Sequence, residues 1–410
     1  MRVLIVNTRH YAGGGDSTYA FNLAELLRAN GHTVSFFAMQ GPRNLPDSNA
    51  DLFVSSIDFR ALNKSKTPLT ALRVLTRSVY SLEARQKFAR LLVRVNPDIV
   101  HVQNIHAHIT PSVILEAAKR RIPVVWTLHD YKLMCPNSHF IREPGGEICE
   151  ECRGKAFLQA ARRRCKKGSL LASSMAAIEA YAHRIMRVND RVSAFLCPSA
   201  FLQDKLIQYG FDMGKTVHLP LPLPKDAFHP GTPSDGAILF LGRLEQRKGI
   251  HILLEVARLA PRVKIILAGN VEEPLKSQLP DLLPPNVVYA GFKSGPDLLQ
   301  LQCESSALVF PSIWYENQPM SILETFALGK PVIASDLGGM RELIGAEERG
   351  RLVPAGDAHA LAESLNWITE HPQDARRMGE NAYQYASRYH SPESHYERIM
   401  RIYAEARKTL

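Results

Sequence analysis

Two carboxylates in the second half of the chain stand eight residues apart. Glu316 and Glu324 lie within the segment 310–335, and a helix is expected to begin between them, near Met320 and Ser321. At a rise of about 1.5 Å per residue they are about 12 Å apart, beyond the roughly 5 to 9.5 Å that separates the paired carboxylates of a glycosidase. We therefore expect them to hold an extended ligand at both ends, with the helix start attracting an anion.

Two cations precede this segment in the same half of the chain. Arg243 and Lys248 follow an apolar run, 237–242, that predicts a strand, and Gly242 at its end lets the backbone approach a ligand closely. Guanidinium and ammonium groups both bind phosphate oxygens. The sequence therefore predicts that a diphosphate lies beside these two residues.

Short apolar runs alternating with helical segments predict the elements that position these residues. Runs that are apolar throughout are typical of parallel sheets covered on both faces, and a proline-rich stretch interrupts the alternation. Ligands of such sheets bind beyond the carboxyl ends of the strands, so the site is expected in the cleft between two domains. We predict an α/β fold of two doubly wound Rossmann-like domains, 1–222 and 237–385, with a linker at 223–236 and a C-terminal helix at 386–410 that docks back on the first domain.

The positive charge of the chain is concentrated in its first half. Residues 1–200 carry 28 Lys and Arg against 15 Asp and Glu, whereas the rest carries 22 against 25. This excess indicates an anionic partner for the first half. The composition is otherwise that of a globular protein, and no apolar run reaches the ~18 residues of a membrane span. We expect a cytoplasmic protein that can work at the inner face of the membrane.

The Arg243 and Lys248 pair, followed by the E-x7-E pattern that starts at Glu316, resembles the retaining glycosyltransferases of family 4, which have the GT-B fold. The resemblance covers nearly the whole chain. It implies transfer of a sugar from a nucleotide-diphosphate sugar to a glycan or lipid-linked acceptor, in polysaccharide or glycoconjugate synthesis. It also implies that domain 1–222 binds the acceptor and domain 237–385 the donor.

The same resemblance assigns roles to individual residues. Arg243 and Lys248 take the donor diphosphate, Glu316 the sugar hydroxyls and Glu324 the ribose. The implied catalytic residues are His129, which approaches the transferred sugar, with Glu316, Arg243 and Lys248. The implied donor-binding residues are Gly14 and Gly15 of a glycine-rich loop that begins at Gly13, with Gly242, Arg243, Lys248, Glu316, Asn317, Met320, Ser321 and Glu324.

One position departs from the family pattern. Pro319 stands where members often have glycine, and proline has no N–H to offer a phosphate, so these contacts are expected to fall to Met320 and Ser321. The chain contains no Asp-x-Asp, so no metal is implied at the diphosphate. We predict no covalent nucleophile and no cofactor for catalysis.

Four cysteines form a separate pattern. They follow C-x13-C-x2-C-x12-C in a basic insert, 135–168, where either a structural zinc bound by four thiolates or four reduced thiols fits the spacing. The basic residues of the insert favour contact with an anionic membrane surface or with a lipid-pyrophosphate-linked acceptor. The candidate zinc ligands are Cys135, Cys149, Cys152 and Cys165.

Three other functions remain as alternatives. An NAD-dependent dehydrogenase is disfavoured because Gly13, Gly15 and Thr18 do not fit G-x-G-x-x-G and no acidic residue ends the second predicted strand. A nucleotide-sugar epimerase of the GT-B fold shares the expected architecture. A non-catalytic basic binding protein would explain the charge, but no nucleic-acid recognition pattern is present, so no nucleic acid partner is expected.

Overall fold

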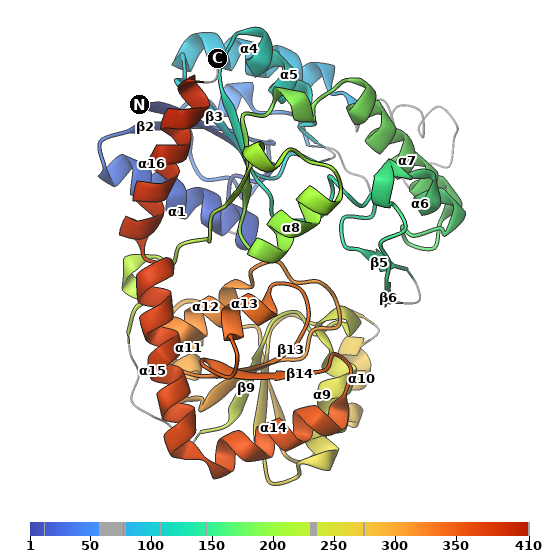
Figure 1. Cartoon of the computed structure of the whole chain (residues 1–410), viewed down its shortest axis with the longest axis vertical. Coiled ribbons are helices and arrows are strands. Elements are labelled where there is room, and N and C mark those ends of the chain that lie inside the picture. The colour runs from blue at the N-terminus through green and yellow to red at the C-terminus, as the bar shows by residue number, and fades with distance from the viewer. Residues whose placement is uncertain are drawn as a thin grey trace. The chain divides into compact units, whose positions relative to one another are not determined.

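The computed structural model describes residues 1–11, 13–56, 77, 79–106, 108–143, 146–229, 236–273 and 275–408. The chain divides into an N-terminal unit, Met1–Pro198 with Leu202–Leu219 and His395–Leu410, and a C-terminal unit, Ser199–Phe201 with Pro220–Ser394. Each unit is built on a six-stranded parallel sheet (Figure 1). The predicted α/β fold with two Rossmann-like domains is confirmed.

The sheet of the N-terminal unit has the strand order β2-β1-β3-β4-β7-β8. These strands are short and almost entirely buried, which explains why their sequences are apolar throughout instead of alternating. The order reverses between β1 and β3. The strands are β1 (Arg2–Val6), β2 (Thr33–Phe37), β3 (Ile99–Val102), β4 (Val124–Thr127), β7 (Ala194–Cys197) and β8 (Thr216–His218).

Helices connect these strands, and a small antiparallel hairpin lies in the insert after β4. Ser81 and Ser169 cap α4 and α7 by accepting hydrogen bonds from the first turn. The elements are α1 (Gly15–Ala29), α4 (Leu82–Val95), α5 (Ser112–Lys119), β5 (Ile141–Arg142), β6 (Glu147–Ile148), α6 (Leu158–Arg162), α7 (Leu170–Ile185) and α8 (Ala200–Gln208). Among the described residues no helix is both long and apolar enough to cross a bilayer.

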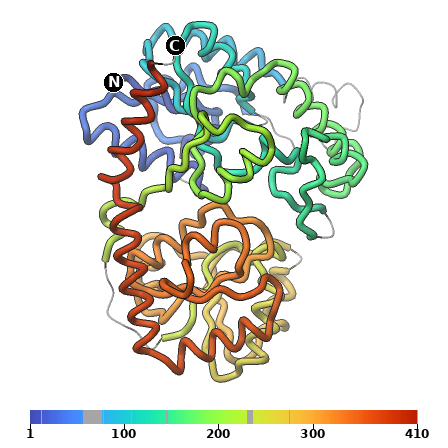
Figure 2. The backbone as a smooth tube through the Cα atoms, viewed as in Figure 1, coloured from blue at the N-terminus to red at the C-terminus, as the bar shows by residue number. Residues whose placement is uncertain are grey.

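The last helix, α16 (Pro392–Lys408), packs on the N-terminal unit from His395 onward. Figures 1 and 2 show its final turns beside the first elements of the chain. The His395 Nε2 lies 3.1 Å from the Tyr19 hydroxyl of α1, and the Tyr403 hydroxyl lies 2.6 Å from Nδ1 of His101 in β3. The predicted segment 386–410 corresponds to the end of α15 followed by α16.

The sheet of the C-terminal unit has the order β11-β10-β9-β12-β13-β14. This is the doubly wound arrangement in which the order reverses between the first and fourth strands, here β9 and β12. Loops that leave the carboxyl ends of these two strands diverge and form a binding crevice. The strands are β9 (Ile238–Leu241), β10 (Ile265–Ala268), β11 (Val287–Gly291), β12 (Ala307–Phe310), β13 (Val332–Ser335) and β14 (Gly350–Val353).

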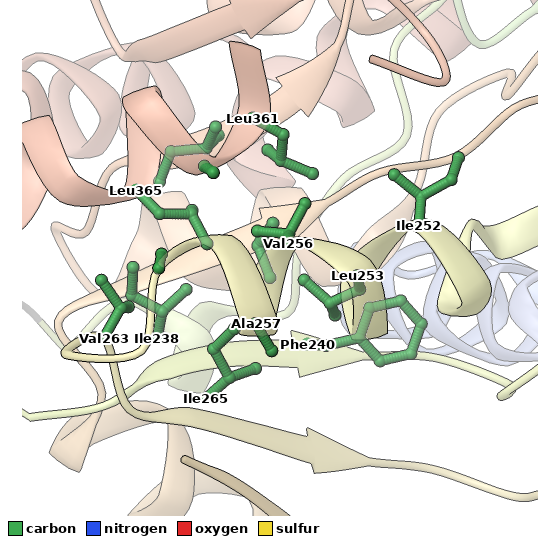
Figure 3. Packing of buried hydrophobic residues seen from close by; sticks show 14 of the residues in the cluster. Ile238, Phe240, Ile252, Leu253, Val256, Ala257, Val263, Ile265, Leu361 and Leu365 are labelled. Carbon is green, nitrogen blue, oxygen red and sulfur yellow. The ribbon is translucent and has the colours of Figure 1, made fainter. Parts of the chain in front are cut away.

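The C-terminal unit has two apolar clusters that share its sheet. In one of them, Val256 of α9 packs between the strand residues Phe240 and Ile265 and the α14 residues Leu361 and Leu365 (Figure 3). The helices are α9 (Ile250–Leu259), α10 (Leu275–Leu282), α11 (Gly295–Glu304), α12 (Met320–Ala327), α13 (Met340–Ile344), α14 (Ala358–Glu370) and α15 (Pro372–Tyr389).

The predicted linker, 223–236, differs from the observed organisation. Leu223 is 1% exposed in the core of the C-terminal unit, and its N–H donates to the carbonyl of His390 over 2.8 Å. Leu223 therefore attaches this stretch to the C-terminal unit, whose main segment begins at Pro220. Residues 230–235 of the predicted linker lie outside the described residues.

Candidate active site

The two loops at the reversal of the C-terminal sheet bring Lys248 and Glu316 together. Lys248 ends the 3-10 turn η6 (Gln246–Lys248) after β9, and Glu316 lies in the loop after β12. The ammonium Nζ of Lys248 is 2.6 Å from Oε1 of Glu316, and both side chains are largely buried. Two of the residues predicted from spacing alone therefore form one ion pair where a ligand of this fold is expected.

The turn that carries Lys248 rests directly on the loop that follows β12. Gly249 has a φ of 74°, and a Cβ there would lie 1.9 Å from the Pro311 carbonyl oxygen, so only glycine allows this approach. The N–H of Ile313 also donates to the Arg247 carbonyl over 3.0 Å. These contacts fix the separation of the two loops and hence the distance within the ion pair.

Glu316 is held by two further donors. The Ser312 hydroxyl and the Trp314 indole N–H donate to Oε1 over 2.8 and 2.6 Å. Within the part of the chain that the structure describes, Oε2 has no such donor. An ionised carboxylate that is fixed through one oxygen keeps the other available as an acceptor for ligand hydroxyls.

Aromatic rings surround the cations of this site. Lys248 Nζ lies 5.2 Å from the centroid of the Phe310 ring and 5.5 Å from that of Trp314, and the Arg247 guanidinium lies 5.1 Å from the Trp314 ring. Such contacts stabilise a cation that is partly removed from water. Trp314, Ser312 and Arg247 were not predicted from the sequence, although each lies within four residues of a predicted residue.

Arg243 does not join the Lys248 and Glu316 pair. Its guanidinium lies 3.4 Å from Glu245, and its side chain is 59% exposed. Glu245 also contacts Arg247 at 3.3 Å. The two predicted cations therefore follow the same strand but differ in environment. Lys248 is buried beside Glu316, whereas Arg243 extends to solvent directly after Gly242, the residue that follows β9.

The helix predicted between the two glutamates is α12, and Pro319 is its N-cap residue. The N–H groups of Met320 and Ser321 in its first turn have no partner within the helix, so they are free to bind an anion. Glu324 lies one turn further along. Burial raises the pKa of the Glu324 carboxyl, while a hydrogen bond with Gln302 of α11 lowers it.

A glycine pair supports the backbone at Glu316 and Asn317. The Gly339 N–H donates to the Glu316 carbonyl over 2.9 Å, and a Cβ on Gly338 would lie 2.6 Å from the same oxygen. The Ser199 hydroxyl donates to Oδ1 of Asn317 over 2.6 Å. The loop after β13 thus packs against the loop after β12 and fixes the position of its backbone.

We predict that Gly339→Ala destabilises the C-terminal unit by about 1–3 kcal/mol, the usual cost of overpacking. The new Cβ would lie 2.1 Å from the Asn317 carbonyl oxygen, so the backbone of the Glu316 loop must move. Urea unfolding measures the loss. Gly41→Ala, whose Cβ meets nothing closer than 3.4 Å, is the control. Equal unfolding midpoints for the two variants would show that the close packing of Gly339 against the Glu316 loop is not needed for stability.

In the N-terminal unit, His129 follows β4 and is held as a neutral imidazole. Burial lowers its pKa, although the carboxylates of Asp16 and Asp130 oppose this shift. Its Nε2 lies 2.7 Å from Oε1 of Gln103, an amide oxygen that can only accept, so Nε2 carries the hydrogen. His129 therefore lies at the carboxyl end of the sheet as a polar, uncharged group.

The glycine-rich loop of the N-terminal unit leads into α1. Gly14 is the N-cap residue of this helix, Gly15 is its first residue, and the Gly13 carbonyl accepts a hydrogen bond from Arg9 over 2.9 Å. Ala12 before them lies outside the described residues.

The four cysteines of the insert are unpaired, as are the other two of the chain. Within the described residues, no three Cys, His, Asp or Glu side chains form a group arranged to hold a metal ion. The four thiols are nevertheless close enough to affect one another. Burial and the neighbouring cysteines raise the pKa of Cys152 to about 12 and that of Cys165 to about 11.

Comparisons with known families cover both units. Residues 226–385 match the model "Glycosyl transferases group 1", and residues 13–224, about half of the chain, match "Glycosyltransferase Family 4". Among solved structures, sucrose-phosphate synthase from Thermosynechococcus elongatus has a TM-score of 0.71 at 19% identity, with full coverage of both chains. Anabaena HepE in complex with UDP has a TM-score of 0.65 at 18% identity, also with full coverage.

Two named relatives are similar in sequence. A phosphatidyl-myo-inositol mannosyltransferase of Mycolicibacterium smegmatis is 25% identical over 88% of this chain and 82% of its own length. The D-rhamnosyltransferase WbpZ of Pseudomonas aeruginosa is 36% identical over 35% of this chain and 39% of its own length. Because glycosyltransferase models match both units, and the family 4 model alone covers about half of the chain, the chain belongs to glycosyltransferase family 4.

Proposed function

We propose that this protein is a retaining glycosyltransferase that moves a sugar from a nucleotide-diphosphate sugar to a glycan or lipid-linked acceptor in polysaccharide or glycoconjugate synthesis. The observation that carries the proposal is the buried ion pair of Lys248 and Glu316 at the reversal of the sheet. It lies in the domain that resembles the donor-binding domain of the family. Curated relatives act in O-antigen, colanic acid and amylovoran synthesis according to their names.

The proposed donor site uses the residues described above. Lys248 and Arg243 bind the diphosphate, assisted by the N–H groups of Met320 and Ser321, while the free oxygen of Glu316 accepts hydrogen bonds from sugar hydroxyls. Glu324 is assigned to the ribose, and Asn317, Gly242, Gly14 and Gly15 line the donor.

Breaking the bond to the anomeric carbon moves negative charge onto the diphosphate. Cations and N–H groups that are already in place therefore stabilise the transition state more than the ground state. The sugar itself gains positive charge in this step. We assign to His129 a contact with the transferred sugar, where a neutral imidazole can accept a hydrogen bond and does not repel the positively charged ring.

Product analysis tests the proposal. Incubation with nucleotide-diphosphate sugars and acceptor glycans should release the nucleoside diphosphate and yield a product whose new linkage keeps the anomeric configuration of the donor, as NMR can establish. An isomerised donor in the absence of an acceptor would instead indicate an epimerase. Membership in the glycosyltransferase family favours the first outcome.

We further propose that the basic insert acts at an anionic membrane surface. The side chains of Arg162, Arg164 and Lys167 are exposed, whereas Arg163 is engaged by Glu151 at 2.8 Å. Clustered exposed cations attract anionic lipids within a Debye length of the surface.

We also propose that the four cysteines of the insert bind a structural zinc ion. Cys135 is buried, which raises its pKa, while backbone N–H groups of Phe140, Asn137 and His139 bond to its sulfur and lower it. N–H groups directed at a sulfur favour the thiolate form that zinc requires. Among the described residues, the apolar cluster between the insert and α7 has four buried members, so a metal would add stability where the core is small.

We predict about one zinc per chain by elemental analysis of protein purified without chelator. The four sulfur atoms must draw together on binding, since they are not yet arranged as a metal site. Cys149→Ser with Cys152→Ser should remove the zinc and lower the Tm of the N-terminal unit. Cys303→Ser, in the other unit, should retain it. Well under one equivalent in the unmodified protein would rule out the site.

A further inference from the structure

The N-terminal unit contains a cavity of about 460 Å³ that the proposed donor site does not use. All residues that line it belong to this unit. Its volume is within the range of small-molecule binding sites, roughly 300 to 1,000 Å³. It lies between α7 and the sheet strands β4 and β7.

The inner wall of the cavity is aromatic. Trp126 of β4 and Phe195 of β7 are almost fully buried, and their ring centroids are 6.3 Å apart. Phe157 before α6 and Phe211 after α8 add two further rings. The Trp126 N–H already donates to the Gln103 carbonyl, so the ring presents an apolar face to a ligand. This wall suits an apolar chain.

The rim of the cavity is basic. Its lining contains five Lys and Arg against two Asp. Arg187 pairs with Asp190 at 2.6 Å, whereas Arg184 and Lys155 are exposed and form no ion pair with any described residue. These two cations are therefore the groups that can bind an anion at the entrance.

The cavity wall also contacts the segment that carries His129. His106 and Lys132 line the cavity, and each reaches Asp130, which directly follows His129. The His106 Nε2 lies 3.7 Å from Asp130 Oδ1, and the Lys132 backbone N–H donates to the same oxygen over 2.9 Å. Lys132 is itself anchored by Glu179 of α7 at 3.0 Å. A ligand in the cavity therefore touches His106 and Lys132, which contact Asp130, the residue next to His129.

We propose that this cavity binds an anionic amphiphile, with its apolar chain against Trp126 and Phe195 and its phosphate group against Arg184 and Lys155. The inference rests on the proposed function, for which it names the acceptor class: a sugar carried on a lipid phosphate or pyrophosphate, held by its lipid end in the N-terminal unit. A free glycan acceptor has no apolar segment for such a wall.

Dodecyl phosphate below its micellar concentration is the probe. Of the three tryptophans of the chain, Trp126 lies in the cavity, and Trp314 and Trp367 lie in the C-terminal unit, so saturable quenching of fluorescence reports binding. We expect the charge reversal Arg184→Glu to weaken binding at least tenfold and Ala180→Phe, which fills the cavity from α7, to abolish it. Arg191→Glu, exposed nearby but not lining the cavity, should bind like the unaltered protein.

Two comparisons can overturn the proposal. Inorganic phosphate that binds as tightly as dodecyl phosphate would show an anion site without an apolar subsite, and dodecyl maltoside that binds equally would show an apolar site without charge recognition. Unchanged binding in Arg184→Glu and Ala180→Phe would place the amphiphile elsewhere. Binding of nucleotide-diphosphate sugars, followed separately by thermal shift, reports on the C-terminal unit, so failure of the donor proposal is distinguished from failure of this one.

Discussion

Replacing Lys248 with Ala is expected to lower kcat/KM for sugar transfer at least 100-fold. The ammonium group is fixed 2.6 Å from Glu316 and lies over the rings of Phe310 and Trp314, so it is oriented before the donor binds. A preorganised group that stabilises charge developing on a leaving diphosphate commonly contributes about 100- to 1000-fold in rate. Steady-state kinetics over a range of donor concentrations measure this loss.

A matched lysine on the same unit is the control. Lys276 is exposed on α10 and lines no part of the proposed site, so Lys276→Ala should transfer sugar at the rate of the unaltered protein. If Lys248→Ala kept its activity within about twofold of this control, the ion pair would be a structural feature of the loop and the proposed donor site would be wrong.

Glu316 provides the reciprocal test of the same pair. Glu316→Gln retains the shape of the side chain but leaves the Lys248 ammonium without its buried counter-charge, and breaking one side of a buried ion pair costs about 3–5 kcal/mol. The double variant with Lys248→Met should lose less stability than the sum of the single variants, because no unpaired charge remains. Activity should be low in all three.

Residue type and spacing single out Lys248 and Glu316 as candidates because their chemistry can be recognised within each segment. A cation after a strand and a carboxylate before a helix can be recognised singly, and the parallel sheet then brings both to one edge. The sequence could not predict that Arg243 would extend to solvent beside Glu245. Which of the two nearby cations is buried beside Glu316 depends on the turn at Gly249 and its approach to Pro311, a tertiary contact.

The residues that support the site were missed for the same reason. Nothing in the sequence distinguishes Ser312 and Trp314 from their neighbours. Only the folded loop directs their hydrogen-bond donors at one oxygen of Glu316. Strand β14 (Gly350–Val353) is difficult to recognise in the sequence, since the partly exposed Arg351 and Leu352 at its centre interrupt the apolar run expected of a buried strand. Edge strands are buried on fewer sides, so their sequences carry a weaker signal.

Acid is expected to destabilise the N-terminal unit through His101. This side chain is fully buried in β3, where its Nδ1 contacts the Tyr403 hydroxyl and its Nε2 the Thr127 hydroxyl, at 2.6 and 2.7 Å. Burial, with smaller contributions from His395 and His129, lowers the pKa of His101 to about 3. The unfolded chain, with an ordinary histidine pKa of about 6.5, therefore binds the proton more readily than the folded protein does.

The sign of the pH effect follows from this difference. The contribution of neutral His101 to stability is fully present above pH ~6.5 and is lost as the pH falls toward 3, by about 1.4 kcal/mol per unit. Between pH 6.5 and 4.5 the protein should lose about 2 kcal/mol more than His101→Gln, which cannot titrate, in urea unfolding. His359→Gln, which removes an exposed histidine from α14, should follow the unaltered protein. Parallel pH profiles for His101→Gln and the unaltered protein would show that protonation of His101 does not limit stability. The hydrogen bond between His101 and Tyr403 of α16 would then not be the contact that acid disrupts.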